Sequence, residues 1–225
     1  MVISNRKSLQ KKTLTESSPV SVRKKVATIT DYWRKGYRKD NQIPNPVEAK
    51  LYRSILNPIR ARFISWQLQN RYLTADDLPH LDYAFYPLHT EPEITINVYA
   101  RPYLNQIEAL RLISHSLPVH WKLVVKEHPA TNGRRPTGYY EKLLEILNVC
   151  LVPPGMPASF VARHARLVTI LTGSVALEAM MSQVPVLILG NSPFDFLPRS
   201  MVRRVRDPCQ LASEGQDLYI FIPLR

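Results

Sequence analysis

Residues 122–129 have the sequence Lys122-Leu123-Val124-Val125-Lys126-Glu127-His128-Pro129. The unbroken apolar run predicts a strand that is covered on both faces, because a strand with one exposed face would alternate apolar and polar residues. Pro129 biases His128 away from helical dihedrals, so the strand should end in an extended turn. A strand buried on both faces is typical of a parallel α/β sheet.

Strand and helix patterns alternate along the chain from residue 81 onward. Apolar runs predict four other strands, at Tyr83–Tyr86, Val149–Val152, Leu167–Leu171 and Pro185–Leu189. Apolar residues at helical spacing predict helices at Tyr103–Leu117, Tyr139–Leu147, Ala158–His164 and Ser174–Met181. The pattern therefore predicts an α/β fold, with a five-stranded parallel sheet flanked by helices.

The positive charge of the chain lies mainly in its first 80 residues. The 225 residues carry a net charge of +12, and residues 1–80 hold 16 Lys and Arg against 6 Asp and Glu. Apolar spacing predicts a helix over 46–72, which Pro58 should kink or divide. We therefore expect a basic, partly helical N-terminal extension over 1–80 and a second domain over 81–225. Residues 1–71 favour an anionic membrane surface as partner, and no motif for a specific nucleic acid is present.

The cysteines and the hydropathy pattern suggest a cytoplasmic protein. Cys150 and Cys209 are too few for a disulfide framework, and neither stands in a metal-ligand spacing. The sequence contains no apolar run of membrane-spanning length and no signal-peptide pattern. We expect no bound metal and no cofactor.

Two polar stretches follow predicted strands, where parallel sheets bind ligands. In the first, His128 could donate to a phosphate, with Lys126 beside it and Pro129 holding the turn; alternatively, the histidine only closes a loop. In the second, Thr172-Gly173-Ser174 could hold a phosphate through hydroxyls and backbone N–H groups, or could be an ordinary helix cap. Glu178, one helical turn later, could accept from a ribose diol or could be a solvated glutamate.

Two other loops should reach the same edge of the sheet. His89 and Glu91 follow the strand Tyr83–Tyr86, and Asn191 follows the strand Pro185–Leu189. We expect these three residues to line the cleft, although nearby loop carboxylates are more often solvated charges than catalytic groups.

The order of these elements resembles that of the capsule polysaccharide biosynthesis glycosyltransferases, a group that includes the bacterial Kdo transferases. The matching elements are Tyr86-Pro87-Leu88-His89 with Glu91-Pro92-Glu93, Lys126-Glu127-His128-Pro129, Thr172-Gly173-Ser174 with Glu178, and Leu189-Gly190-Asn191. The resemblance covers residues 81–207. It implies a Rossmann-like domain that forms the C-terminal, donor-binding half of a GT-B fold.

The resemblance also implies a set of ligands and roles. The donor would be a CMP-linked nucleotide sugar, and the acceptor a polysaccharide or glycolipid. His128, Thr172 and Ser174 would bind the nucleotide phosphate and Glu178 the ribose, whereas no catalytic residue is assigned. Residues 1–80 would be only the tail of the acceptor domain with a connecting helix. Two alternatives stay open: a CDP-polyol phosphate transferase, and a non-catalytic remnant that binds anionic partners through its basic arm.

Overall fold

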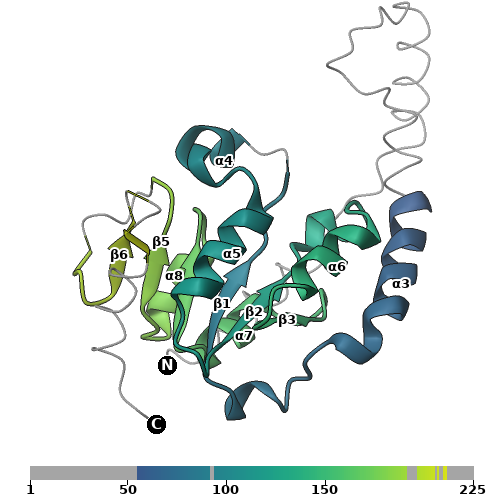
Figure 1. Ribbon diagram of the computed structural model, residues 1–225, viewed down its shortest axis with the longest axis horizontal. Helices are drawn as coiled ribbons and strands as arrows, with labels where there is room; N and C mark the ends of the chain where they lie inside the picture. The colour runs from purple at the N-terminus through teal and green to yellow at the C-terminus, as the bar shows by residue number, and fades with distance from the viewer. Residues whose placement is uncertain (1–54, 92–93, 192–196, 206, 208–209, 212–225) are drawn as a thin grey trace, which may run out of the picture. The chain divides into compact units, whose positions relative to one another are not determined.

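The computed structural model describes residues 55–91, 94–191, 197–205, 207 and 210–211. Residues 1–54 of the basic extension predicted over 1–80, which include the first part of the 46–72 helix, lie outside these residues. The described strands form one sheet in the order β3-β2-β1-β4-β5-β6, with every neighbouring pair parallel (Figure 1). They are β1 Tyr83–Pro87, β2 Lys122–Lys126, β3 Val149–Val152, β4 Leu167–Ile170, β5 Val186–Ile188 and β6 Val202–Arg204.

Helices connect β1 to β2, β2 to β3, β3 to β4 and β4 to β5, so the predicted parallel sheet flanked by helices is confirmed. The α-helices are α3 Asn57–Leu68, α4 Ile94–Tyr99, α5 Gln106–Ser116, α6 Thr137–Leu144, α7 Ala158–His164 and α8 Val175–Met181. Short 3-10 turns lie at η2 Gln69–Arg71, η3 Leu78–His80, η4 Arg101–Tyr103 and η5 Pro129–Thr131. No helix in the described part of the chain is long and apolar enough to cross a bilayer.

The two faces of the sheet bury separate sets of side chains. Within β1, Ala84 and Tyr86 pack in one cluster with residues of α3, α5 and α6. Tyr83 and Phe85 point to the opposite face and pack with residues of α7 and α8. The strand is therefore buried on both sides, which explains why its sequence lacks polar alternation.

Helix α3 packs on the sheet domain through only one of its faces. Ile64 and Leu68 are buried in the cluster that contains Tyr86. Gly133, at φ +82°, lets the loop after β2 approach the α3 backbone closely, because a Cβ at this position would lie 2.2 Å from the carbonyl oxygen of Asn57. The described part of residues 1–80 thus shares a core with the sheet, and the boundary at residue 80 stays a prediction.

Several boundaries differ from the sequence prediction. Helix α5 begins at Gln106 rather than at Tyr103, because the Asn105 side chain caps it by accepting hydrogen bonds from Ile107 N and Glu108 N at 3.2 and 3.5 Å. Pro58 lies in the first turn of α3, and Ile55 and Leu56 directly before α3 have π-helical geometry. Because residues 46–54 lie outside the described residues, a kink or division of the 46–72 helix at Pro58 stays a prediction. The sixth strand, β6, and the short helix α4 were not predicted.

Candidate functional site

The strand order places a topological switch point at the carboxyl ends of β1 and β4. From β1, the chain first adds β2 and then β3 on one side. It then crosses to the other side of β1, where it adds β4, β5 and β6. Such topological switch points are where open α/β sheets bind ligands. Residues 88–91 leave β1 at this point, and residues 171–174 leave β4.

His89 links the two loops at this switch point. Its Nε2 lies 2.5 Å from the backbone oxygen of Thr172, although 83 residues separate the two in the sequence. A Cβ at Gly173 would lie 4.0 Å from the same nitrogen, so Gly173 also borders the histidine. The predicted cleft residue His89 and the first two residues of the Thr172-Gly173-Ser174 motif are therefore brought together.

His128 lies on the adjacent loop, after β2, and is exposed. Its Nδ1 accepts a hydrogen bond from the backbone N–H of Ala130 at 3.1 Å and lies 3.4 Å from the hydroxyl of Thr90. Because Nδ1 is an acceptor, the neutral ring carries its proton on Nε2. The histidine thus closes its loop through one nitrogen and leaves an N–H on the other that can donate to an anion. Pro129 follows as the first residue of η5 and is also exposed.

Lys126 does not extend into solvent with His128. The residue is buried, and its Nζ donates to the backbone oxygen of Glu127 at 3.2 Å. Burial lowers the pKa of Lys126, and the nearby Glu127 carboxylate offsets part of that effect. Lys126 therefore brings a positive charge close to the loop without reaching its surface.

The loop after β4 presents backbone and hydroxyl groups. Gly173 has φ +125°, which favours glycine, and Ser174 occupies the N-cap position of α8 without making a side-chain cap bond. Ser174 and Glu178 are exposed and lie one helical turn apart, so they share a face of α8. Ordinary capping by Ser174 does not account for the motif.

The other two predicted cleft residues have local partners. Glu91 accepts from the side-chain amide of Gln106 and lies 3.8 Å from Arg135 Nη2. Asn191 follows β5, where its N–H donates to the Tyr99 oxygen at 2.8 Å and its side-chain oxygen accepts from Arg204. The described contacts link Glu91 to the His89 loop, but none joins Asn191 to His89 or His128.

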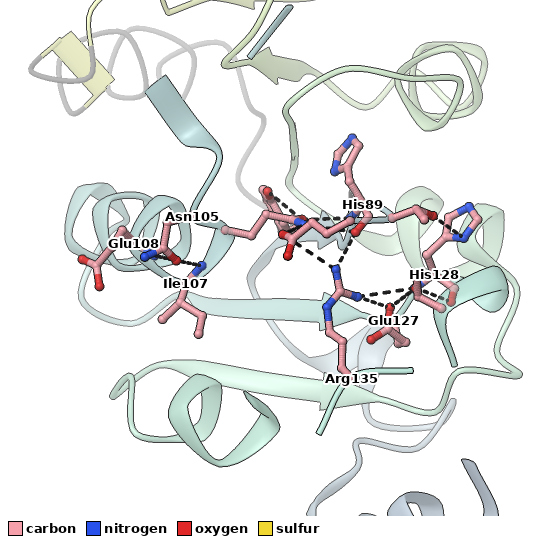
Figure 2. A network of polar contacts seen from close by, with 12 residues as sticks. His89, Asn105, Ile107, Glu108, Glu127, His128 and Arg135 are labelled. Atoms are coloured by element: carbon pink, nitrogen blue, oxygen red, sulfur yellow. Dashed lines mark hydrogen bonds and ion pairs between the residues drawn. The ribbon is translucent and has the colours of Figure 1, made fainter. Parts of the chain in front are cut away.

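A buried polar cluster that contacts the backbone of His89 and His128 was not predicted from the sequence. It consists of Gln106, Glu127, Thr131, Arg135 and Tyr140, and Figure 2 shows Arg135 reaching between the His89 loop and Glu127. The cluster includes a 2.5 Å ion pair between Arg135 Nη1 and Glu127 Oε1. Only the position of Glu127 in the Lys126–Pro129 motif could have drawn attention to it.

A cavity of about 590 Å³ opens beside the His128 loop. It is lined from the loop by Pro129, Ala130, Asn132 and Arg134, and from α3 by Asn57, Pro58 and Ala61. In the described residues, no three His, Cys, Asp or Glu side chains gather as a metal-binding group.

One family model matches this chain. It is described as Capsule polysaccharide biosynthesis protein, and it matches residues 82–198, which is more than half of the chain. None of the curated proteins that were compared with the chain is similar to it.

Several solved structures resemble the fold. KpsC of Thermosulfurimonas dismutans, a beta Kdo 2,7 transferase, has 17% identity and a TM-score of 0.46, over 74% of this chain and 55% of that one. The beta Kdo 2,4 transferase of the same KpsC has 13% identity and a TM-score of 0.44, over 81% and 61%. UDP-GlcNAc 2-epimerase of Methanocaldococcus jannaschii has 17% identity and a TM-score of 0.45, over 69% and 42%. The chain thus spans between 42% and 61% of the length of these structures.

Proposed function

Since the chain belongs to the capsule polysaccharide biosynthesis protein family, we propose that its sheet domain binds the donor of a glycosyltransferase reaction. The observation that carries this proposal is the meeting of His89 and Thr172 at the switch point, next to the exposed His128. The domain would be the C-terminal half of a GT-B fold. Its donor would be a CMP-linked nucleotide sugar, and its acceptor a polysaccharide or glycolipid.

The phosphate of the donor would lie between the loops after β2 and β4. His128 would donate from Nε2, and Thr172 and Ser174 would add hydroxyl groups on the other side. Gly173 would let the phosphate approach the backbone, since no side chain stands there. Lys126 would contribute its charge from behind the loop, and Glu178 would accept from the ribose hydroxyls.

In the transfer step, the acceptor hydroxyl oxygen forms a bond to the anomeric carbon of the sugar and gives its proton to a base. The bond between that carbon and the donor phosphate oxygen breaks, and the phosphate oxygen keeps the electron pair. Donors aimed at that oxygen lower the barrier because they stabilise the charge that develops on it. The Nε2–H of His128 is suited to this role. The acceptor hydroxyl, its base and the other wall of the cleft belong to the acceptor half of a GT-B enzyme.

The test is calorimetric titration of the purified chain with CMP, CDP and UDP. We expect one nucleotide to bind and His128→Ala to lose that binding. His120→Ala is the matched control, because His120 is also exposed but precedes β2, at the opposite edge of the sheet. Lack of binding by a folded wild-type chain, or equal binding by His128→Ala, would contradict the proposed site.

The matches support neither the CDP-polyol phosphate transferase nor the non-catalytic remnant. Tighter binding of CDP than of CMP in the titration would nevertheless favour the CDP-polyol phosphate transferase. The three nucleotides therefore test the donor class as well as the site.

We also propose that residues 1–71 contact an anionic membrane surface, at the cytoplasmic face of the inner membrane. The favouring observation is a second apolar face on α3, opposite Ile64 and Leu68. Its side chains are exposed by more than half, at 60% for Ile59, 54% for Phe63 and 65% for Trp66, and Ile55, two residues before α3, is 50% exposed. Helix α3 contains two arginines and no acidic residue. Aromatic and aliphatic side chains flanked by arginine suit the interface of an anionic bilayer.

Co-sedimentation with vesicles tests this contact. We expect the chain to bind phosphatidylglycerol vesicles more strongly than phosphatidylcholine vesicles, and Phe63→Ser/Trp66→Ser to weaken that binding. Leu112→Ser, on the exposed side of α5, is the control. If the double variant sediments like the wild type, α3 is not the membrane contact.

A further inference from the structure

We propose that Arg135 is a positioning residue that holds the loop carrying His89 and the loop carrying His128 at a fixed distance from each other, a role that rests on the proposed donor site. The Arg135 side chain is only 7% exposed and lies between the two loops. Its Nη2 donates to the backbone oxygen of His89 at 2.6 Å, and its Nη1 donates to Glu127 Oε1 at 2.5 Å. One guanidinium thus joins the end of β1 to the end of β2 (Figure 2).

Glu127 transmits this contact to His128. Its Oε1 also accepts from the backbone N–H of His128 at 2.7 Å and from the Thr131 hydroxyl at 2.7 Å. Its Oε2 accepts from the Tyr140 hydroxyl at 2.7 Å. The carboxylate is therefore fixed at both oxygens, and the backbone of His128 follows its position.

Gln106 holds the other loop from the α5 side. Its Oε1 accepts from the N–H of His89 at 2.8 Å, and its Nε2 donates to the oxygen of His89 at 3.0 Å. Arg135 donates to that same oxygen. The backbone of His89 is held at both polar groups while its imidazole reaches Thr172, so the cluster controls where the imidazole stands.

The chemistry of the ion pair between Arg135 and Glu127 indicates that it positions the two loops and does more than stabilise the fold. Burying an ion pair is expensive, and apolar residues of similar volume often give equal stability. A guanidinium, however, can donate in two directions at fixed geometry, which a lysine ammonium at the same place cannot reproduce. The Cζ atom of Arg135 also lies 4.8 Å from the centroid of the Tyr139 ring. This contact further fixes the plane of the guanidinium.

Arg135→Lys is the first test, since lysine keeps the positive charge but cannot donate to both loops at the fixed geometry of the guanidinium. We expect the folded variant to bind the preferred nucleotide about ten- to a hundredfold more weakly, by analogy with the loss of a residue that orients a metal ligand. Arg166→Lys is the matched control. Arg166 pairs with Asp82 at 2.7 Å but at the opposite edge of the sheet, and it should leave nucleotide affinity unchanged.

A second readout does not depend on nucleotide binding. In NMR spectra of the imidazole nitrogens, we expect Arg135→Lys to shift the His89 and His128 signals and to leave those of His115 and His120 in place. If the wild type binds no nucleotide, the proposed function fails, and these signals still decide whether Arg135 positions the histidines.

The double variant Arg135→Met/Glu127→Met separates positioning from folding. It removes both charges, so it should recover stability that Arg135→Met alone loses. We expect it to fold, to bind nucleotide as weakly as Arg135→Lys, and to show displaced His89 and His128 signals. A folded double variant with affinity within about twofold of the wild type and unmoved histidine signals would overturn the proposal.

Discussion

Replacing Glu127 by glutamine should destabilise the protein strongly, and the contacts of Glu127 set the size of the effect. Glutamine keeps one oxygen, which can still accept from the His128 N–H and the Thr131 hydroxyl. It loses the charge that faces Arg135, in a pair whose side chains are 7% and 3% exposed. It also places an amide N–H₂ toward the Tyr140 hydroxyl, which now donates to Oε2.

Removing one partner of a buried ion pair costs about 3–5 kcal/mol. Because the amide oxygen can still accept three of the four hydrogen bonds, including the one from Arg135 Nη1, and Glu91 lies 3.8 Å from Arg135, we expect the lower end, about 3 kcal/mol. For a domain of this size that is a fall in Tm of roughly 6–12 °C.

Urea denaturation followed by circular dichroism measures the loss. Glu108→Gln is the control, because Glu108 pairs with Arg111 at 3.5 Å on the exposed surface of α5. That variant should change the free energy of unfolding by no more than about 0.5 kcal/mol. A loss in Glu127→Gln of less than about 1 kcal/mol, or one equal to that of Glu108→Gln, would refute the view that the buried pair holds the loops.

Three other predictions concern the loop after β2, the buried tyrosines and the outer face of α3. Gly133→Ala should destabilise by about 2 kcal/mol or more, because its φ is +82° and its Cβ would lie 2.2 Å from the Asn57 oxygen; Gly155→Ala, with nothing within 4 Å, is the control in urea denaturation. Burial raises the pKa of Tyr86, Tyr139 and Tyr140 above 10.0. Their contribution to stability is therefore complete below pH 10 and is lost as the pH rises further, since only the unfolded chain then releases those protons; a tyrosinate absorbance that rises with unfolding would agree, and one that rises in the folded protein would not. Phe63→Ser/Trp66→Ser should change stability by less than about 1 kcal/mol, because both side chains are more than half exposed; a larger loss in thermal unfolding would mean that this face is covered.

Local sequence determined the elements that depend on continuous burial. The apolar runs at Leu123–Val125 and Leu167–Ile170 are strands, and Ala158–His164 is a helix with the predicted bounds. Apolar runs of this kind are easy to predict, because a strand or helix made of apolar side chains must be covered by other elements. Strand β6 was missed because Val202-Arg203-Arg204 is short and two of its three residues are arginines. Helix α4 was missed because β-branched residues dominate Ile94–Tyr99.

The candidate site shows where such reasoning ends. The motifs around His128 and Thr172 could be found because each directly follows an apolar strand. Arg135 and Gln106 could not, because a buried arginine or glutamine looks like a surface residue until its partners are known.

The sequence by itself therefore determined the parallel sheet, the loops that leave its strands and the polar residues on those loops. Only the tertiary structure decided which loops meet. The contact of His89 with Thr172 follows from β4 pairing with β1, which places residues 83 positions apart side by side. The ion pair of Arg135 with Glu127 likewise depends on burial, where a charge persists only if a partner of opposite charge lies within reach.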